Sequence, residues 1–228
     1  MLTRELLGTA QVPGGEELKL FSHGRDFMIV LGHNELMSTR QRGSEEALAR
    51  MTLERLKGVA QPHLLIGGYG MGFTLRAALA ELGPKAKITV VELVPEIIAW
   101  ARGPMAGLTA GCLDDPRVTL KMGDVGEQIL LASDRYDAIL LDVDNGPDGL
   151  VREDNNRIYS RDGLRAARET LNPGGMLAVW SAAKDNKFVR RMVRAHFTVE
   201  EVEVRARIDA EGRGKGPRHI IWFARKAA

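Results

Sequence analysis

The sequence predicts an α/β fold with a mostly parallel sheet covered by helices on both faces, a terminal antiparallel hairpin and a small β meander that comes first. From Pro62 onward, short apolar runs alternate with helical patterns, which is typical of parallel strands joined by crossover helices. Residues 88–92 are rich in β-branched side chains, as expected of a strand covered on both faces. Residues 197–208 alternate strictly instead, which indicates a strand with one exposed face.

Composition limits the domain count and the function classes. With 228 residues, 44% hydrophobic and 27% charged, the chain can bury one full core, so we expect a catalytic domain over residues 44–228 and a small meander over residues 1–43. The single Cys112 excludes an internal disulfide, and the five histidines lack paired ligand spacing, so we expect no metal. No apolar run approaches the roughly 20 residues of a membrane helix, and the first residues lack a signal-peptide profile. We therefore expect no membrane partner and a cytoplasmic location. The net charge of +2 is too small to indicate a nucleic-acid partner, and we expect none.

The meander is predicted from short strand-like runs over residues 18–21, 26–31 and 35–37, joined by glycine-containing turns. It is too small to fold alone, so it must pack on the main domain or on another subunit. From Ser44 the pattern becomes helical.

Five core strands and three intervening helices follow. The strands are expected over residues 64–66, 88–92, 118–120, 136–142 and 176–181. The helices are expected over residues 73–82, 95–100 and 160–171. Gly83-Pro84 ends the first helix, Pro95 suits the first turn of the second, and Ser160 suits the N-cap of the third. After the third helix, Asn172-Pro-Gly-Gly is expected to form the turn into the fifth strand.

The last portion predicts a helix over residues 185–196 and then a hairpin. The strand over residues 197–208 returns through a Gly-rich loop, residues 212–218, to an apolar strand at residues 220–223. If the core strands are numbered in chain order, the expected sheet order is 3-2-1-4-5-7-6.

The turn after the first core strand predicts an adenosyl-ligand site. Gly68, Gly70 and Gly72 stand at every second position, so the backbone can turn sharply where any Cβ would collide with a ligand. The spacing is GxGxG, which is typical of S-adenosylmethionine-dependent transferases, whereas GxGxxG belongs to nicotinamide and flavin sites. A nicotinamide dehydrogenase is therefore disfavoured.

Polar residues at the other strand ends should converge on the same ligand. Glu92 could accept hydrogen bonds from both ribose hydroxyls of the ligand. Asp124 could accept a hydrogen bond from the adenine amino group, or it could cap the helix that begins near Val125. Asp142 lies at the mouth of the pocket, where the reacting atoms meet. The predicted cofactor-binding residues are Gly67, Gly68, Tyr69, Gly70, Gly72, Glu92, Leu93, Asp124, Val125 and Asp142.

The acidic loop over residues 142–148 is the predicted catalytic segment. Clustered carboxylates repel one another, so a cationic substrate or a proton to be moved explains them, although Asp, Asn, Gly and Pro are also ordinary turn residues. Asp142 and Asp144 are the predicted catalytic residues. Asn145, Asp148, Tyr159 and Arg218 are the predicted substrate residues. The basic residues near Arg218 have a second interpretation as a charged edge strand that discourages aggregation.

These motifs together resemble a known family. Gly-Gly-Tyr-Gly-Met-Gly, Val-Val-Glu92, Gly-Asp124 and Tyr136-Asp-Ala-Ile-Leu-Leu-Asp142 look like the spermidine synthase (polyamine aminopropyltransferase) family, a branch of the class I methyltransferase fold. The resemblance implies a Rossmann-like three-layer sandwich, an S-adenosyl donor and an amine acceptor, with Asp142 as the base. It also implies a homo-oligomer formed through the meander, and substrate contacts from the loop over residues 212–218.

Two departures from the family pattern shape the functional hypothesis. Gly70 replaces an aspartate that holds the amine of decarboxylated S-adenosylmethionine, and Ser44-Glu-Glu-Ala-Leu replaces a Tyr-His-Glu segment. Backbone amides of an all-glycine turn suit a carboxylate tail better than an aspartate does. The main hypothesis is therefore methyl transfer from S-adenosylmethionine to a small amine-bearing acceptor. The alternatives are an aminopropyltransferase that uses decarboxylated S-adenosylmethionine and a non-catalytic oligomer that binds an adenosyl ligand.

Overall fold

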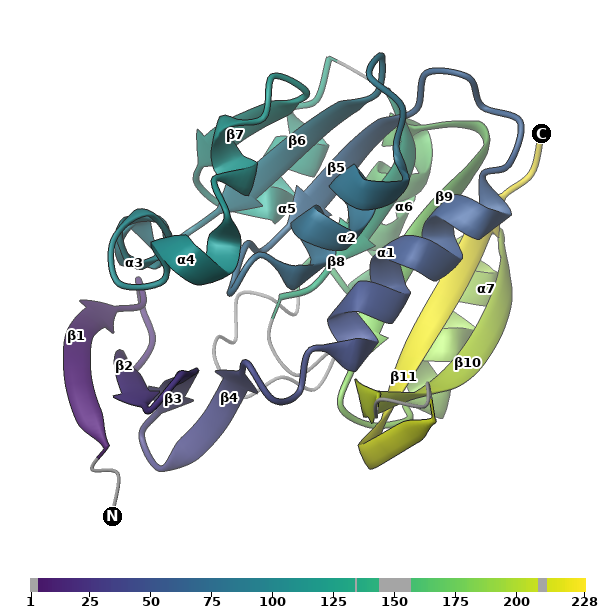
Figure 1. The fold of residues 1–228 in the computed structure, drawn as a ribbon. Helices are drawn as coiled ribbons and strands as arrows, with labels where there is room; N and C mark the ends of the chain where they lie inside the picture. Colours follow the sequence, from purple (N-terminus) through teal and green to yellow (C-terminus); the bar gives the residue numbers. More distant parts are fainter. Residues whose placement is uncertain (1–3, 134, 144–156, 209–212) are drawn as a thin grey trace.

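Two sheets organise the chain in a computed structural model that describes residues 4–133, 135–143, 157–208 and 213–228 (Figure 1). A 4-stranded antiparallel sheet has the order β1-β2-β3-β4, and a 7-stranded sheet has the order β10-β11-β9-β8-β5-β6-β7. Counted among the core strands from the other edge, the second order is 3-2-1-4-5-7-6. The predicted fold class and strand order are therefore confirmed.

The small sheet contains one strand more than the sequence predicts. Its strands are β1 (Glu5–Gln11), β2 (Glu17–His23), β3 (Asp26–Leu31) and β4 (Asn34–Ser38). The missed strand, β1, is mostly exposed and has an irregular register between Leu6 and Gly8, so it lacks the alternation of an ordinary strand. A Cβ on Gly8 would lie 2.6 Å from Nε1 of Trp100, so glycine lets this strand approach the main domain closely.

The large sheet is parallel from β7 to β9 and antiparallel at its other edge. Its strands are β5 (His63–Gly67), β6 (Lys87–Glu92), β7 (Val118–Met122), β8 (Tyr136–Leu141), β9 (Leu171–Ser181), β10 (Phe197–Ile208) and β11 (Gly214–Lys226). The α-helices are α1 (Gly43–Arg55), α2 (Phe73–Glu81), α3 (Pro95–Arg102), α4 (Ala106–Thr109), α5 (Val125–Leu130), α6 (Arg161–Thr170) and α7 (Asn186–Arg194). The predicted domain boundary, residue 43, is the first residue of α1.

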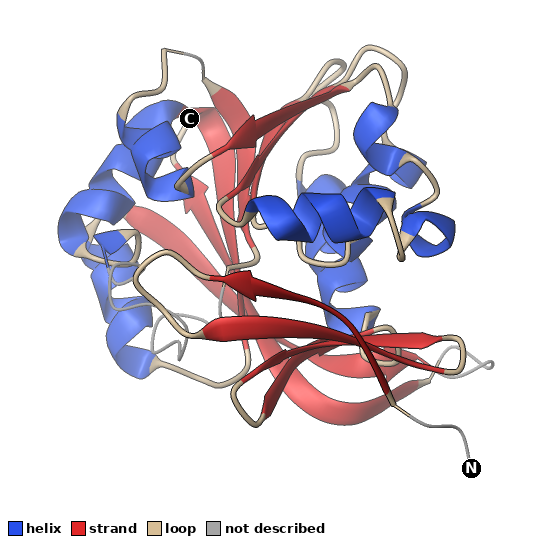
Figure 2. Ribbon diagram, turned by 90° about the vertical axis from the view of Figure 1, so that its left-hand side faces the viewer, coloured by secondary structure: helices blue, strands red, loops and turns tan. Residues whose placement is uncertain are grey.

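Helices lie on both sides of this sheet (Figure 2), and the apolar residues form two cores. Alternate residues of β5 separate them: Leu64 and Ile66 belong to the core that includes α1, α2 and α3, whereas Leu65 belongs to the core that includes α5, α6 and α7. The meander strands β2 and β3 contribute to the first core. The result is a three-layer sandwich whose first layer is extended by the meander.

Two local predictions need correction. The strand β9 begins at Leu171, directly after α6, so Asn172-Pro-Gly-Gly lies within an irregular strand start and does not form a separate turn. The strand β11 begins at Gly214, and Arg218 lies opposite Arg205 in the register of β10 and β11. Most of the predicted loop over residues 212–218 is therefore strand. Pairing with the long strand β10 overrides the loop-forming composition of this segment.

Among the described residues, no helix is long and apolar enough to cross a membrane. The same ranges hold no group of three or more His, Cys, Asp or Glu side chains that could bind a metal ion.

Candidate active site

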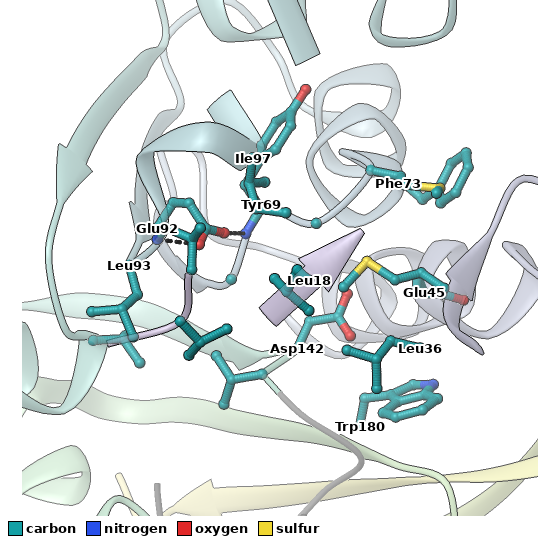
Figure 3. A pocket seen from close by; sticks show the side chains of 18 of the residues that line it. Leu18, Leu36, Glu45, Tyr69, Phe73, Glu92, Leu93, Ile97, Asp142 and Trp180 are labelled. Atoms are coloured by element: carbon teal, nitrogen blue, oxygen red, sulfur yellow. Dashed lines mark hydrogen bonds between the residues drawn. The ribbon is translucent and has the colours of Figure 1, made fainter. Parts of the chain in front are cut away.

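A cavity of about 320 Å³ lies beyond the carboxyl ends of the parallel strands (Figure 3). Its first wall follows the ends of β5, β6, β7 and β8, and its second wall comes from the meander strands β2 and β4. The third wall consists of Glu45 from α1, Trp180 from β9 and His219 from β11. The site therefore joins the meander, the parallel sheet and the terminal hairpin.

The glycine turn is held tightly against the end of β8. Gly68 has a φ of +84°, and a Cβ there would lie only 2.4 Å from the carbonyl oxygen of Asp142. Its amide donates a hydrogen bond of 2.9 Å to the carbonyl of Val91. Only glycine fits this position, because both the backbone conformation and the approach to Asp142 exclude a side chain.

The amides of the glycine turn are largely used within the protein. The amide of Tyr69 donates to Oε2 of Glu92 at 2.8 Å, and the amide of Gly72 donates to the carbonyl of Tyr69 at 2.8 Å. Beside Gly70, a Cβ would lie 2.9 Å from Sδ of Met37, so the meander fills the space next to this residue. The turn is thus less open to a ligand carboxylate than the glycine pattern predicts.

Glu92 is a buried carboxylate that links the turn to the end of β6. Its Oε2 accepts the bond from Tyr69, and its Oε1 accepts a bond of 2.8 Å from the amide of Val94. Burial raises the pKa of Glu92, and the backbone amides, including those of Gly70 and Leu93, oppose this shift. These bonds fix the carboxylate at the edge of the cavity.

Asp124 caps the next helix and also lines the cavity. Its Oδ1 accepts hydrogen bonds from the amides of Gly126 at 2.7 Å and Glu127 at 3.2 Å, as an N-cap residue does. Val125 follows it in the lining. The capping interpretation of Asp124 is therefore confirmed, and its contact with a ligand stays a prediction.

Two carboxylates with strongly raised pKa values face the cavity. Burial raises the pKa of Asp142 to about 6, although the Thr74 hydroxyl, which donates to its Oδ2 at 2.8 Å, opposes the shift. Burial raises the pKa of Glu45 to about 8, and the charge of Asp142 adds to this effect. Such a pair holds a proton near neutral pH and can exchange it with a ligand. Sequence analysis did not identify Glu45.

A hydrogen-bond chain continues from Glu45 to the terminal hairpin. The Ser44 hydroxyl donates to Oε2 of Glu45 at 2.8 Å and lies 2.9 Å from Nδ1 of His219. The His219 ring packs edge-on against Trp180, with ring centroids 4.7 Å apart. The buried indole Nε1 of Trp180 has no hydrogen-bond partner among the described residues. Burial lowers the pKa of His219, which favours the neutral ring.

Most of the predicted cofactor-binding residues line the cavity, and the other predicted site residues that the structure describes lie outside it. The structure places Gly68, Tyr69, Gly70, Glu92, Leu93, Asp124, Val125 and Asp142 in the cavity lining. Gly67 and Gly72 support the turn and are not part of this lining. Tyr159 is buried below it, where its hydroxyl donates to the carbonyl of Val143 at 3.3 Å, and the exposed Arg218 pairs with Glu203 at 3.1 Å, outside the lining. Asp144, Asn145 and Asp148 lie outside the described residues.

The cavity has a strongly acidic lining. Its carboxylates are Glu35, Glu45, Glu92, Asp124 and Asp142. Across the described ranges, the lining contains no lysine or arginine, and its one basic side chain is His219. Such a lining attracts cationic ligands and disfavours anionic groups.

Known proteins resemble the chain in sequence and in fold. Residues 43–201, more than half of the chain, match the spermine/spermidine synthase domain family. A polyamine aminopropyltransferase from Corynebacterium efficiens is 30% identical over 172 residues, which cover 74% of this chain and 31% of that protein. One from Korarchaeum cryptofilum is 29% identical over 184 residues, which cover 79% of this chain and 53% of that protein. The chain thus spans about half or less of these relatives.

The structural comparison gives the same fold. A spermidine synthase crystallised in complex with the transition state analogue AdoDATO matches with a TM-score of 0.73 and 17% identity. The match covers 97% of this chain and 72% of that one. At this identity the likeness shows the fold, including the small sheet, and leaves the reaction to the site residues.

Proposed function

This chain belongs to the spermine/spermidine synthase domain family, and on that premise we propose that it transfers an aminopropyl group from decarboxylated S-adenosylmethionine to a small amine. Relatives that are polyamine aminopropyltransferases support this alternative over methyl transfer. Glu92 and Asp124 would hold the ribose and the adenine of the donor, and Asp142 would accept a proton from the acceptor amine.

The acidic cavity lining is the observation that carries the proposal. Decarboxylated S-adenosylmethionine has a sulfonium and an ammonium group, whereas S-adenosylmethionine has an additional carboxylate. In this cavity, that carboxylate would meet no lysine or arginine among the lining residues that the structure describes. The amides of Gly68, Tyr69 and Gly72 are already bonded within the protein and cannot all compensate. The charge balance therefore supports the decarboxylated donor, against the expectation from the all-glycine turn.

The reaction requires a deprotonated amine in line with a carbon–sulfur bond. The donor supplies a propyl carbon that is activated by the positive sulfur. An acceptor ammonium gives one N–H proton to Asp142, and its lone pair then forms the new C–N bond. The C–S bond breaks as its electron pair returns to sulfur, which yields methylthioadenosine. The pKa of about 6 leaves Asp142 mostly ionised at neutral pH and close enough to neutrality to receive a proton.

Product analysis with paired donors tests the proposal. The purified protein would be incubated with linear diamines and either donor, while calorimetry measures the binding of each donor. We expect tighter binding of the decarboxylated donor and formation of methylthioadenosine. Formation of S-adenosylhomocysteine would support methyl transfer instead. Binding without turnover across the amine panel would favour the non-catalytic alternative, and binding of neither donor would contradict the adenosyl site itself.

The predicted homo-oligomer through the meander stays a proposal. Leu6 on β1 is an exposed apolar side chain on this sheet. Light scattering of the full chain and of a Leu6→Glu variant would test it, because loss of the oligomer in the variant is expected only if β1 lies at the interface.

A further inference from the structure

The buried chain from Glu45 through Ser44 to His219 connects the acidic cavity with the terminal hairpin. Ser44 is fully buried at 0% exposure, and its hydroxyl lies within hydrogen-bond distance of both Oε2 of Glu45 and Nδ1 of His219. The two ends differ in surroundings, since Glu45 faces the charge of Asp142 and His219 packs against the apolar ring of Trp180. A buried hydroxyl between a carboxylate and an imidazole is the simplest element that can pass a proton.

The hydrogen bonds that connect Glu45, Ser44 and His219 can run in either of two directions. A serine hydroxyl has one hydrogen, so when it donates to an ionised Glu45, Nδ1 of His219 must be the donor to the serine oxygen. When Glu45 is protonated, it can donate to Ser44, and Ser44 then donates to Nδ1 of His219. The hydrogen of a neutral ring moves to Nε2 in that orientation. The two orientations differ by the passage of one proton along the chain.

We propose that Ser44 and His219 form a relay that carries the proton of the acceptor amine away from the carboxylates of Asp142 and Glu45. This inference rests on the proposed function, because amine transfer supplies the proton. An ammonium N–H bond breaks and its proton binds Asp142, while Glu45 already holds a proton of its own near neutral pH. Glu45 passes a proton to the serine oxygen as the serine hydrogen moves to Nδ1 of His219, and the resulting imidazolium releases its Nε2 hydrogen to water. Asp142 then gives its proton to Glu45, so that Asp142, Glu45 and Ser44 are back in their starting forms. His219 ends with its hydrogen on Nδ1 and regains the Nε2 tautomer by proton exchange with water before the next cycle. No electrons are exchanged.

The proton affinities favour the transfer from Asp142 to Glu45 and oppose the transfer from Glu45 to His219. Glu45 has a higher pKa than Asp142, so a proton on Asp142 moves to Glu45 once Glu45 has passed its own proton to Ser44. Cationic ligands in the cavity lower the proton affinity of Glu45, which favours the onward step to His219. Once the imidazolium forms, its burial favours loss of the proton.

Variants of the two relay residues test the proposal kinetically. Ser44→Ala removes the connecting hydroxyl, and His219→Ala removes the terminal acceptor. Thr52→Val is the matched control, because Thr52 is a fully buried residue of the same helix whose hydroxyl donates to the carbonyl of Leu48 and lies outside the cavity lining. We expect kcat for methylthioadenosine formation to fall about tenfold or more in both relay variants. Donor affinity measured by calorimetry should stay within about threefold, and the control should match the wild type.

Chemical rescue separates proton transfer from packing. Added imidazole should restore kcat of His219→Ala saturably, because it can fill the vacated space and accept the proton from Ser44. It should not restore Ser44→Ala, in which the connection itself is absent. Wild-type kcat in both variants, or a loss in His219→Ala that imidazole does not restore, would overturn the relay.

A spectroscopic test is independent of turnover. At pH 9, where Glu45 is ionised, ¹⁵N NMR of the imidazole should show the hydrogen of His219 on Nδ1 in the wild type and on Nε2 in Ser44→Ala. The same Nε2 tautomer in both proteins would contradict the hydrogen-bond chain from Glu45 through Ser44 to His219. A wild-type protein that forms no methylthioadenosine would contradict the proposed function alone, and the tautomer would then decide the hydrogen-bond chain.

Discussion

Replacement of Gly68 by alanine tests how the glycine turn is built. Gly68 combines a φ of +84° with a close approach to the end of β8, where an added Cβ would lie 2.4 Å from the backbone oxygen of Asp142. Gly174 in β9 is the matched control, because its φ is +75° and no heavy atom lies within 4 Å of a Cβ built there. The pair separates backbone strain from steric overlap.

The expected magnitude follows from these two contributions. The left-handed conformation costs about 1–2 kcal/mol for a residue with a Cβ. Overlap with a backbone atom that cannot rotate away adds about 1–3 kcal/mol. Gly68→Ala should therefore lower the free energy of unfolding by about 2–5 kcal/mol, and Gly174→Ala by only about 1–2 kcal/mol. For a chain of this size, each kcal/mol corresponds to a decrease in Tm of about 2–4 °C.

Urea denaturation of the wild type and both variants provides the measurement, with calorimetric donor binding in parallel. Gly68→Ala should also weaken donor binding, because relief of the overlap moves the backbone at Asp142. If Gly68→Ala is no more destabilising than Gly174→Ala and binds the donor as the wild type does, the close approach of the turn to β8 does not exist as described.

Three further predictions concern the carboxylates of the cavity. Asp142→Asn should lower kcat by about 10²–10⁴-fold at nearly unchanged donor affinity, as measured by methylthioadenosine formation and calorimetry, and unchanged turnover would refute the role of Asp142 as the base. Thr74→Val removes the hydroxyl that lowers the pKa of Asp142, so the acidic limb of the profile of kcat/KM against pH should move to higher pH, and a shift to lower pH would contradict the bond. The pKa of Glu45 is raised from 4.5 to about 8 and that of Asp142 from 3.8 to about 6, so the folded protein binds protons more tightly than the unfolded chain. Their contribution to the free energy of unfolding is therefore complete below pH 3.8–4.5, the ordinary pKa values, and is lost as the pH rises to about 8. Glu45→Gln should make the loss of stability between pH 7 and pH 9 less steep, as measured by urea titrations at pH 5, 7 and 9. An unchanged pH dependence would argue against the raised pKa of Glu45.

The sequence predicts the main sheet well because its local patterns and its tertiary structure agree. The continuous apolar strands, the glycine turn and the alternation over residues 197–208 each have one consistent interpretation, and together they give the confirmed strand order. The strand β1 escapes prediction because it gains its structure from pairing with β2 and from the close approach of Gly8 to Trp100. The start of β11 escapes prediction for a similar reason, since pairing with β10 determines it.

The candidate site is only partly visible in the sequence. Glu92, Asp124 and Asp142 follow strand ends, where the topology itself indicates a ligand. Glu45 lies in the first turn of α1, where acidic residues are common because they interact favourably with the helix dipole. His219 is 175 residues from Ser44 in the sequence, so no local pattern connects them. Sequence patterns reveal the residues that the sheet positions, and the folded structure reveals those that α1 and the hairpin bring to them.

The position of Met37 beside Gly70 couples the meander to the ligand site. The meander supplies one wall of the cavity, with Leu18 from β2 and Glu35–Ser38 from β4. Because linkage is reciprocal, a ligand that contacts this wall holds the meander in place with the same free energy that the docked meander adds to the ligand's affinity. A donor that contacts this wall would therefore dissociate more slowly the more firmly the small sheet is docked on the domain. Amide hydrogen exchange in β4 and the dissociation rate of the donor should therefore change together when contacts between the two sheets are weakened.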